Sequence, residues 1–222
     1  MRRLLVFLRE PVPGTVKTRL AQALGDQAAC DIYRACVELT LERLRAFQDT
    51  ALLSVEPPEA LARIRTWLGP AWALAPQQGR DLGARLSHAT TQAFADGAQQ
   101  VVVIGTDSPW LEPADIEAAL TALSRADVVL GPTDDGGYYL IGLSRPAPAL
   151  FEGIAWSTAS VYAQTRARAD RLWLSLSALP LGYDVGELDD LRRWLAEESA
   201  RGMPPQLNAI ASLSQRRALC LS

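Results

Sequence analysis

Short apolar runs alternate with longer stretches of helical periodicity along the chain, a pattern typical of a parallel β-sheet flanked by helices. The strand candidates are rich in Val, Leu and Ile, as in strands buried on both faces. They are predicted at 4–8, 51–55, 71–74, 101–104, 127–132, 138–143 and 172–176. The helix candidates lie at about 26–47, 59–68, 82–94, 113–123, 158–169 and from 189 onward, with a peripheral helix and tail over 204–222. The pattern predicts an α/β fold.

Length and composition fit one globular domain, so we interpret residues 1–222 as a single domain. The 22 basic and 25 acidic residues leave a net charge of −3, which gives no general attraction to nucleic acid or anionic membranes. Three cysteines without a C-x-x-C pair argue against a disulfide framework, and a reducing cytoplasm fits best. The apolar run at 4–8 is too short for a signal peptide, and no segment is long enough to span a bilayer.

Two acidic turns follow two of the buried strand candidates. Asp107 comes directly after the strand at 101–104, and Asp134 and Asp135 follow the strand at 127–132. The carboxyl ends of the strands border the ligand crevice of an open α/β sheet, and we expect these two strands to be adjacent. We therefore interpret the three acids as catalytic candidates. The alternative is an ordinary turn, since Asp-Gly and Asp-Ser-Pro are common turn sequences.

The second acidic turn continues into two glycines and a tyrosine, Gly136, Gly137 and Tyr138. Glycine has no Cβ, so this loop can approach a ligand closely, and tyrosine can wall a pocket with an amphipathic ring. Trp156, before a later helix capped by Ser157 or Thr158, is a further wall candidate. We interpret Gly136, Gly137, Tyr138 and Trp156 as the pocket for an acceptor substrate. For Trp156, packing in the core is an equally ordinary interpretation.

A cation-rich loop follows the first strand, and it contains Arg9, Gly14, Lys17 and Arg19. Cations, free backbone N–H groups and a rigid turn are the features that bind a phosphate chain. The loop has neither the Walker A spacing nor G-x-G-x-x-G. We interpret these four residues as nucleotide or phosphate ligands, and the alternative is a solvated basic loop.

A second strand-to-helix turn contains further candidates for nucleotide binding. Gln77 or Gln78 can contact a base or sugar, and Arg80 or Arg85 can reach phosphate, with Gln78 and Arg85 preferred. The alternative, in which Asp81 merely starts the next helix, is about as well supported.

Asp184 precedes the last long helix, so its carboxylate can face the same crevice as Asp107. Asp189 and Asp190 are first-turn acids favoured by the helix dipole. His88 is the only histidine and lies inside a predicted helix, which excludes serine-histidine triads and histidine-rich metal sites.

Taken in order, these motifs resemble nucleotide-diphospho-sugar transferases of the GT-A type. Within that group the chain is similar to the bacterial radical-SAM/selenodomain-associated transferases of type 1, also described as arsenosugar-biosynthesis glycosyltransferases. The motifs that carry the resemblance are Arg9-Glu10-Pro11-Val12-Pro13-Gly14, Lys17-Thr18-Arg19-Leu20, Gln78-Gly79, Asp81-Leu82-Gly83, Arg85-Leu86, Gly105-Thr106-Asp107-Ser108-Pro109, Gly131-Pro132, Asp135-Gly136-Gly137-Tyr138-Tyr139-Leu140 and Trp156-Ser157-Thr158.

The resemblance implies a Rossmann-like, mixed but mostly parallel sheet with helices on both faces and a nucleotide at its first half. It implies a divalent metal, Mg²⁺ or Mn²⁺, held by Asp107, and suggests kinship with guanylyltransferases that activate phospholactate or molybdopterin. The family commonly reads Asp-x-Asp-Thr before the last helix, but Gly186 and Glu187 replace the second aspartate and the threonine. Either Asp184 supplies the second metal contact alone, or metal binding is weakened.

The leading hypothesis is a metal-dependent glycosyltransferase with a nucleotide-sugar donor and a small-molecule acceptor, the metal held by Asp107 and Asp184. The alternatives are a nucleotidyltransferase that uses a nucleoside triphosphate and an inactive nucleotide-binding domain. Asp134 or Asp135 would orient the acceptor hydroxyl or act as its base. A homodimer is compatible with the sequence.

Overall fold

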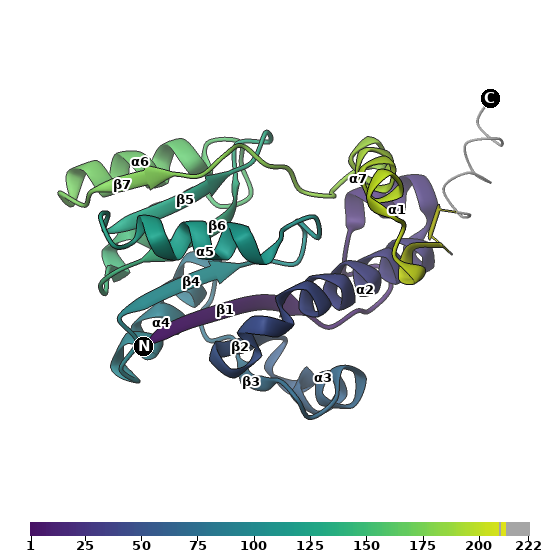
Figure 1. The fold of residues 1–222 in the computed structure, drawn as a ribbon, viewed down its shortest axis with the longest axis horizontal. Helices are drawn as coiled ribbons and strands as arrows, with labels where there is room; N and C mark the ends of the chain where they lie inside the picture. Colours follow the sequence, from purple (N-terminus) through teal and green to yellow (C-terminus); the bar gives the residue numbers. More distant parts are fainter. Residues whose placement is uncertain (209, 212–222) are drawn as a thin grey trace.

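Seven strands form one mixed sheet in the computed structural model, which describes residues 1–208 and 210–211 (Figure 1). The strands are β1 (Arg2–Arg9), β2 (Ala51–Glu56), β3 (Ala73–Pro76), β4 (Gln100–Ile104), β5 (Val128–Pro132), β6 (Tyr138–Leu143) and β7 (Leu176–Ala178). Their order across the sheet is β3-β2-β1-β4-β6-β5-β7, and β6 alone runs antiparallel to its neighbours. The predicted α/β fold with a mixed, mostly parallel sheet is confirmed.

Helices cover both faces of this sheet. They are α1 (Thr18–Leu24), α2 (Asp26–Arg43), α3 (Leu61–Leu68), α4 (Leu82–Ala95), α5 (Pro113–Ala122), α6 (Val161–Arg171) and α7 (Leu188–Arg201), with 3₁₀ turns η1 (Leu44–Thr50), η2 (Pro58–Ala60) and η3 (Pro148–Phe151). Apolar residues of α2, α3 and α5 pack on one face, and those of α4, η3 and α6 pack on the other. A third cluster joins α1 and α7 to the outer side of α2 (Figure 1).

Strand β1 shows why the central strands are apolar throughout. Leu4, Val6 and Leu8 belong to the core under α2, α3 and α5. Leu5 and Phe7 point to the opposite face and pack with the core under α4 and α6. Successive side chains of a strand alternate between faces, so a strand covered by helices on both sides needs an uninterrupted apolar run.

The starts of two helices, α4 and α5, agree with the sequence and are marked by caps. Pro113 occupies the first turn of α5, and a capping box joins Glu112 and Asp115. The side chain of Asp81 accepts a hydrogen bond from the Ala84 amide at 2.8 Å, so Asp81 is the N-cap of α4. These caps fix where each helix leaves the carboxyl edge of the sheet.

Two predictions about strands are wrong. The strands at 101–104 and 128–132 are not adjacent, because a tight hairpin folds β6 back between β4 and β5. Both strands still end at the same edge of the sheet. The strand predicted at 172–176 is instead β7 at Leu176–Ala178, since the amides of Trp173 and Leu174 bond to the end of α6 and are not available to the sheet.

Smaller differences concern helix ends. The helix predicted to about residue 47 ends at Arg43 and continues as a 3₁₀ turn, and helix α6 is preceded by Ser160, not by Ser157 or Thr158. Ser157 has a φ of 63°, which ends the preceding turn before the helix can begin. Helical residues at 205–208 and 210–211 fit the start of the helix predicted over 204–222, whose remainder lies outside the described residues. No described helix has the length and apolar composition needed to cross a bilayer.

Candidate active site

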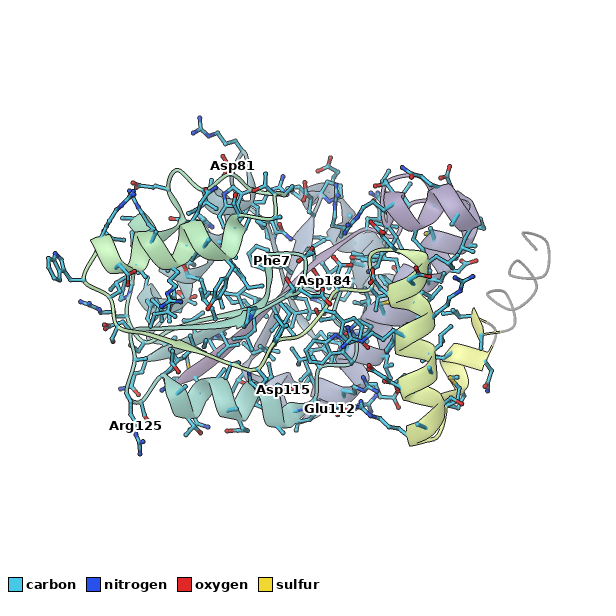
Figure 2. The ribbon with its side chains drawn as sticks, turned by 90° about the horizontal axis from the view of Figure 1, so that it is seen from above. Phe7, Asp81, Glu112, Asp115, Arg125 and Asp184 are labelled. Carbon is cyan, nitrogen blue, oxygen red and sulfur yellow. The ribbon has the colours of Figure 1, made fainter. Side chains whose placement is uncertain are left out.

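The three acids Asp107, Asp135 and Asp184 come together at the carboxyl edge of the sheet. Asp107 follows β4, and Asp135 lies in the turn that follows β5. The chain at residues 182–185 crosses both strand ends, because Gly182 bonds with Pro132 and the Val185 amide donates to the Asp107 carbonyl at 2.7 Å. This crossing segment places Asp184 beside the two turns, near the middle of the molecule (Figure 2).

A buried lysine connects the first loop to this edge. Lys17 has a left-handed backbone (φ 49°) at the start of α1, and its side chain is only 3% exposed. Its Nζ lies 2.5 Å from Asp107 Oδ1 and donates to the Val185 carbonyl at 2.5 Å. Burial alone would lower the pKa of the ammonium, but the charges of Asp107 and Asp184 raise its pKa above the ordinary value. Lys17 therefore stays charged and holds the Asp107 loop to the crossing segment.

Asp184 is the most deeply buried of the three acids. Burial, followed by the charge of Asp107, raises the pKa of its carboxyl to about 6. Ser108 Oγ donates a hydrogen bond to Asp184 Oδ1 at 2.5 Å and partly opposes this rise. The charge of Lys17 also lowers the pKa of Asp184, but less than burial and Asp107 raise it.

The two acids of the β5–β6 turn have different surroundings. Asp135 Oδ1 accepts hydrogen bonds from Thr133 Oγ1 at 2.6 Å and from the Gly137 amide at 3.1 Å, and its charge also raises the pKa of Asp184. Asp134 instead pairs with Arg193 of α7 at 3.4 Å. Of the two acids in this turn, Asp135 is therefore the one whose charge affects Asp184.

Gly136 is the tight point of this turn. It has a φ of 86°, and a Cβ there would lie far inside van der Waals contact with the backbone of Ala159. Its own carbonyl accepts a hydrogen bond from the Tyr162 amide at 2.9 Å. The turn is therefore fastened to the segment that starts α6.

Replacing Gly136 by alanine is expected to destabilise the protein by about 2 kcal/mol or more, because the new Cβ requires the backbone to shift and the left-handed φ disfavours it. Chemical denaturation of the variant measures the loss. Gly97→Ala is the matched control, since Gly97 has a φ of 92° with nothing within 4 Å of a Cβ. Equal losses in the two variants would show that φ alone, and not the contact with Ala159, restrains this turn.

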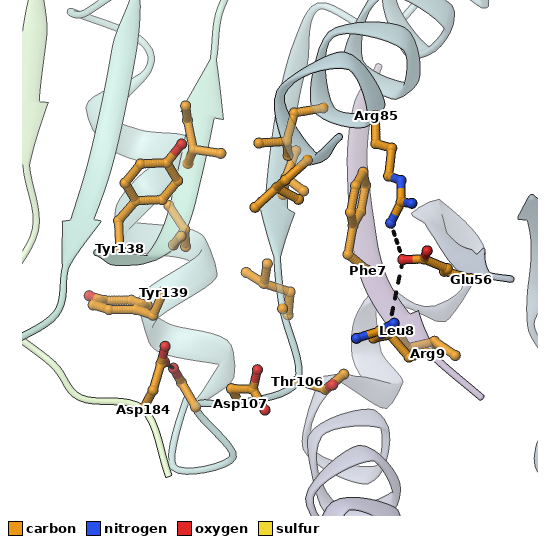
Figure 3. A pocket seen from close by; sticks show the side chains of 18 of the residues that line it. Phe7, Leu8, Arg9, Glu56, Arg85, Thr106, Asp107, Tyr138, Tyr139 and Asp184 are labelled. Carbon is orange, nitrogen blue, oxygen red and sulfur yellow. Dashed lines mark hydrogen bonds and ion pairs between the residues drawn. The ribbon is translucent and has the colours of Figure 1, made fainter. Parts of the chain in front are cut away.

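The main cavity, of about 620 Å³, opens along the carboxyl ends of β1, β2 and β4 and the amino end of β6 (Figure 3). Its lining includes Asp107, Asp184 and Tyr138 toward one side, and Arg9, Glu56 and Arg85 toward the other. This size is within the usual range of small-molecule sites. The cavity is therefore large enough for a nucleotide.

A smaller cavity of about 260 Å³ adjoins the first and shares Asp184 with it. Its lining residues are Arg19, Asp134, Asp135, Asp184, Glu187 and Asp190. Most of these carboxylates accept hydrogen bonds from their own turns; Asp190, for example, accepts from the amides of Gly186 and Glu187. Arg19 is the cation of this cavity, and it makes one pair with Glu187 at 3.3 Å.

Gly186, which stands where the similar family commonly has a second aspartate, lies against the side chain of Arg19. A Cβ at position 186 would lie 2.5 Å from Arg19 Nη2, so the guanidinium occupies the room that a larger residue would take. A second metal-binding carboxylate is therefore absent from this position, and a cation lies there instead.

The predicted nucleotide ligands are distributed over both cavities. Arg9 and Arg85 line the main cavity and both pair with Glu56. Gln77 lines it as well, whereas Gln78 is exposed outside the lining. Gly14 has a φ of 81° and turns the loop before Lys17. Nucleotide binding by all six predicted residues, the cavity-lining Arg9, Arg19 and Arg85 included, stays a prediction.

Among the predicted acceptor residues, Tyr138 lines the main cavity, and Trp156 lies edge-on behind it with ring centroids 6.5 Å apart. Gly83 of α4 makes room for the Trp156 ring. Contact between an acceptor and any of the four residues, Gly136, Gly137, Tyr138 and Trp156, stays a prediction.

Sequence reasoning did not find Glu56, Ser108 or Tyr33 as parts of the site. Tyr33 of α2 bonds through its hydroxyl to both the amide and the carbonyl of Arg9, at 2.7 and 3.1 Å, and so fixes the end of β1. Glu56 directly follows the strand predicted at 51–55, on the side of the sheet where ligands bind, so its position in the sequence could have indicated a role. Ser108 follows Asp107 in a quoted motif, but its spacing does not predict a bond to Asp184, and nothing local marks Tyr33.

The donor set at the centre suits one hard cation. The carboxylates of Asp107 and Asp184 offer oxygen ligands, and Mg²⁺ is commonly held by one or two carboxylates together with substrate phosphates. Within residues 1–208 and 210–211, no group of three or more His, Cys, Asp and Glu side chains forms a complete metal site.

Comparison with known proteins agrees with this fold. Over 97% of both chains, a candidate nucleotide-diphospho-sugar transferase from Desulfovibrio desulfuricans G20 has a similar structure, with a TM-score of 0.90 and 33% identity. Phosphoenolpyruvate guanylyltransferase of Chloroflexus aggregans is 31% identical over 66% of this chain and 71% of the relative. Mycobacterium tuberculosis Rv0371c, solved with manganese, shares the fold at 16% identity, with a TM-score of 0.54 over 88% of this chain and 99% of that chain.

A synthetase of CMP-2-keto-3-deoxy-manno-octonic acid, solved with CTP, also shares the fold, at 11% identity and a TM-score of 0.51 over 89% of this chain and 99% of that chain. Fold and relatives define the protein as an enzyme of the GT-A-like superfamily of nucleotidyl and glycosyl transferases. It belongs to the DUF2064 family, described as an uncharacterized protein conserved in bacteria, whose profile matches residues 40–158.

Proposed function

We propose that this protein is a metal-dependent nucleotidyltransferase that joins the nucleotide of a nucleoside triphosphate to the phosphate of a small phosphorylated acid. The paired carboxylates of Asp107 and Asp184, held by Lys17 between two cavities, are the observation that carries the proposal. The resemblance to phosphoenolpyruvate guanylyltransferase favours guanosine triphosphate and phosphoenolpyruvate as the first substrates to test.

In this reaction an oxygen of the acceptor phosphate attacks the α-phosphorus, the bond to the β-phosphate oxygen breaks, and pyrophosphate leaves. The attacking phosphate is already ionised, so no general base is needed. Asp107 and Asp184 would hold Mg²⁺ or Mn²⁺, which supplies positive charge against the charge of the leaving group. Lys17 keeps Asp107 in place, and Arg19 faces the smaller cavity, where it can orient the acceptor phosphate.

Glycosyl transfer from a nucleotide sugar is the second candidate. Asp135 supports it, because this carboxylate lines the smaller cavity and lies where it could orient an acceptor hydroxyl. The similarity to a candidate nucleotide-diphospho-sugar transferase favours the same chemistry.

Thermal unfolding with a panel of nucleoside triphosphates and nucleotide sugars, each with Mg²⁺ or Mn²⁺, tests the proposal. A ligand at about a hundred times its dissociation constant adds about 2.7 kcal/mol of stability, which raises the Tm by roughly 5–10 °C. We expect the larger shift with a triphosphate, and only when metal is present. A larger shift with a nucleotide sugar would move the assignment to glycosyl transfer, and no shift with any nucleotide would contradict both.

Replacing Gly186 by alanine is expected to raise the KM for the acceptor about tenfold while the Kd for the nucleotide stays nearly unchanged, because the Cβ displaces the Arg19 guanidinium from its place. Initial rates at varied acceptor concentration, combined with nucleotide titration, separate the two constants. Arg192→Ala is the control, since Arg192 is exposed and pairs with Asp189 on the outer side of α7. An unchanged acceptor KM would remove Arg19 from acceptor binding.

A further inference from the structure

The side of the main cavity away from Asp107 and Asp184 is built by the ends of three parallel strands. Arg9 of β1 pairs with Glu56 of β2 in the strand register. Val55 pairs with Pro76 of β3, and the Gln77 amide donates to the Val55 carbonyl at 2.8 Å, so Gln77 lies next to Glu56. Paired residues of parallel strands project to the same face of the sheet. Arg9, Glu56 and Gln77 therefore form a row of polar residues across this part of the cavity.

The amide of Gln77 is fixed in one orientation. Its Nε2 donates to the Ser54 carbonyl at 2.9 Å and to the Leu8 carbonyl at 3.4 Å, and the residue is 8% exposed. Both partners are carbonyl oxygens, which only accept, so the nitrogen and not the oxygen must face them. Gln77 Oε1 accepts no hydrogen bond from the described residues, and Gln77 lines the main cavity. Gln77 thus offers an acceptor and no donor.

Glu56 offers a second acceptor beside it. Arg85 binds Glu56 Oε2, and Arg9 lies 3.8 Å from the same oxygen (Figure 3). The other carboxylate oxygen, Oε1, makes no hydrogen bond with the described part of the chain. The Arg85 guanidinium is in turn held by the Gly79 carbonyl at 3.1 Å, so its remaining N–H groups keep a defined position.

Apolar side chains flank this polar row. Phe7, Leu82 and Leu86 line the same cavity, and the Phe7 ring stands beside the Glu56 and Arg85 side chains in Figure 3. Flat apolar walls with a few fixed polar groups are the usual surroundings of an aromatic ligand. This part of the cavity suits a nucleobase, whose phosphates would extend toward Asp107.

We propose that Gln77 and Glu56 select a guanine base, an inference that rests on the proposed function. Guanine presents two adjacent donors, N1–H and the 2-amino group, beside the acceptor O6. Two acceptors from Gln77 and Glu56 and a donor from Arg85 match this order. Adenine and cytosine each present one donor beside a ring nitrogen that only accepts, and uracil presents one donor between two carbonyls. Each of these bases leaves at least one fixed acceptor without a partner.

Calorimetric titration of the full chain with GTP, ATP, ITP and 2′-deoxy-GTP in the presence of Mg²⁺ tests the assignment. We expect GTP to bind about tenfold or more tightly than ATP, because an unpaired acceptor in a partly buried site costs a factor of this size. ITP lacks the 2-amino group and should bind with intermediate affinity, and 2′-deoxy-GTP should bind like GTP. A strong loss with 2′-deoxy-GTP together with equal affinities for GTP and ATP would show that Glu56 binds the ribose, and would overturn the assignment.

Two variants test the residues themselves. Gln77→Leu removes the acceptor, and Glu56→Gln keeps the shape of the side chain but supplies a donor; each should reduce the preference for GTP over ATP to about threefold or less. The second variant leaves the hydrogen bonds of Gln77 to the strands intact, so it answers the question even if Gln77→Leu folds poorly. Gln92→Leu on the exposed side of α4 is the matched control and should keep the full preference.

The outcomes separate this inference from the function on which it rests. No binding of any triphosphate would contradict the proposed function. Metal-dependent binding of all four nucleoside triphosphates with similar affinity would leave that function standing and would overturn the role of Gln77 and Glu56. An unchanged GTP preference in Glu56→Gln would likewise overturn it.

Discussion

Asp107→Asn is expected to reduce kcat by about 10²–10³-fold or more, because an amide cannot supply the negative charge that holds a divalent cation at the phosphates. The amide oxygen can still accept a hydrogen bond from Lys17 Nζ, which lies 2.5 Å from Asp107 Oδ1 in the native protein. The variant should therefore fold and show near-native circular dichroism. Pyrophosphate release measures the loss of turnover.

Asp189→Asn is the matched control for this experiment. Asp189 lies in the first turn of α7, its side chain is 91% exposed, and it pairs with Arg192. It lines neither cavity. The control should keep the native kcat within about twofold, since exposed ion pairs contribute little. An Asp107→Asn enzyme with native turnover would remove Asp107 from the reaction.

Arg43→Met is expected to lower the free energy of unfolding by about 3–5 kcal/mol, because it leaves a buried carboxylate without its hydrogen-bonded partner and with only Arg201, at 3.9 Å, nearby. Arg43 Nη2 donates to both oxygens of Glu198 at 2.8 and 2.7 Å, and the Glu198 side chain is 1% exposed. Arg43 also donates to the Pro109 carbonyl and lies 3.3 Å from Glu112. One side chain thus joins α2, α7 and the loop that follows Asp107. Thermal unfolding should show a fall in Tm of roughly 6–20 °C.

Two further variants show whether the unpaired charge is the cause. The double variant Arg43→Met/Glu198→Met should recover most of the lost stability, since removing both charges leaves no buried ion without a partner. Arg2→Met removes an exposed pair with Glu117, at 3.2 Å, and should cost less than about 1 kcal/mol. A double variant as unstable as Arg43→Met would show that packing or the bond to Pro109, and not the charge of Glu198, carries the effect.

Local chemistry explains why most elements could be predicted from the sequence. The capping box at Glu112 and Asp115 and the cap at Asp81 are marked by adjacent residues, and the buried strands are marked by continuous apolar runs. The position of β6 between β4 and β5 depends on competition between strand partners, which no local pattern records. The apolar residues Leu172 and Leu174 suggested a strand, but their backbone amides donate hydrogen bonds to carbonyls at the end of α6 and so are not available to the sheet.

Some parts of the candidate site could also be predicted from the sequence, and others could not. The acids at strand ends could be found, because the carboxyl edge of an α/β sheet is where ligands bind. The burial of Lys17 behind Asp107, the hydrogen bond from Ser108 to Asp184 and the place of Arg19 against Gly186 join segments far apart in the chain. Such contacts are set by the folded backbone, so residue type and spacing do not reveal them.

Phosphorus NMR of a reaction with GTP, phosphoenolpyruvate, Mg²⁺ and the native enzyme tests the central claim most directly, because it identifies which phosphorus–oxygen bond breaks. The account predicts equal amounts of pyrophosphate and of a diphosphate-linked adduct of guanosine monophosphate and the acceptor, with neither product in the Asp107→Asn variant. Unchanged GTP and phosphoenolpyruvate, together with release of a nucleoside diphosphate when the same enzyme is given a nucleotide sugar and an acceptor, would contradict it.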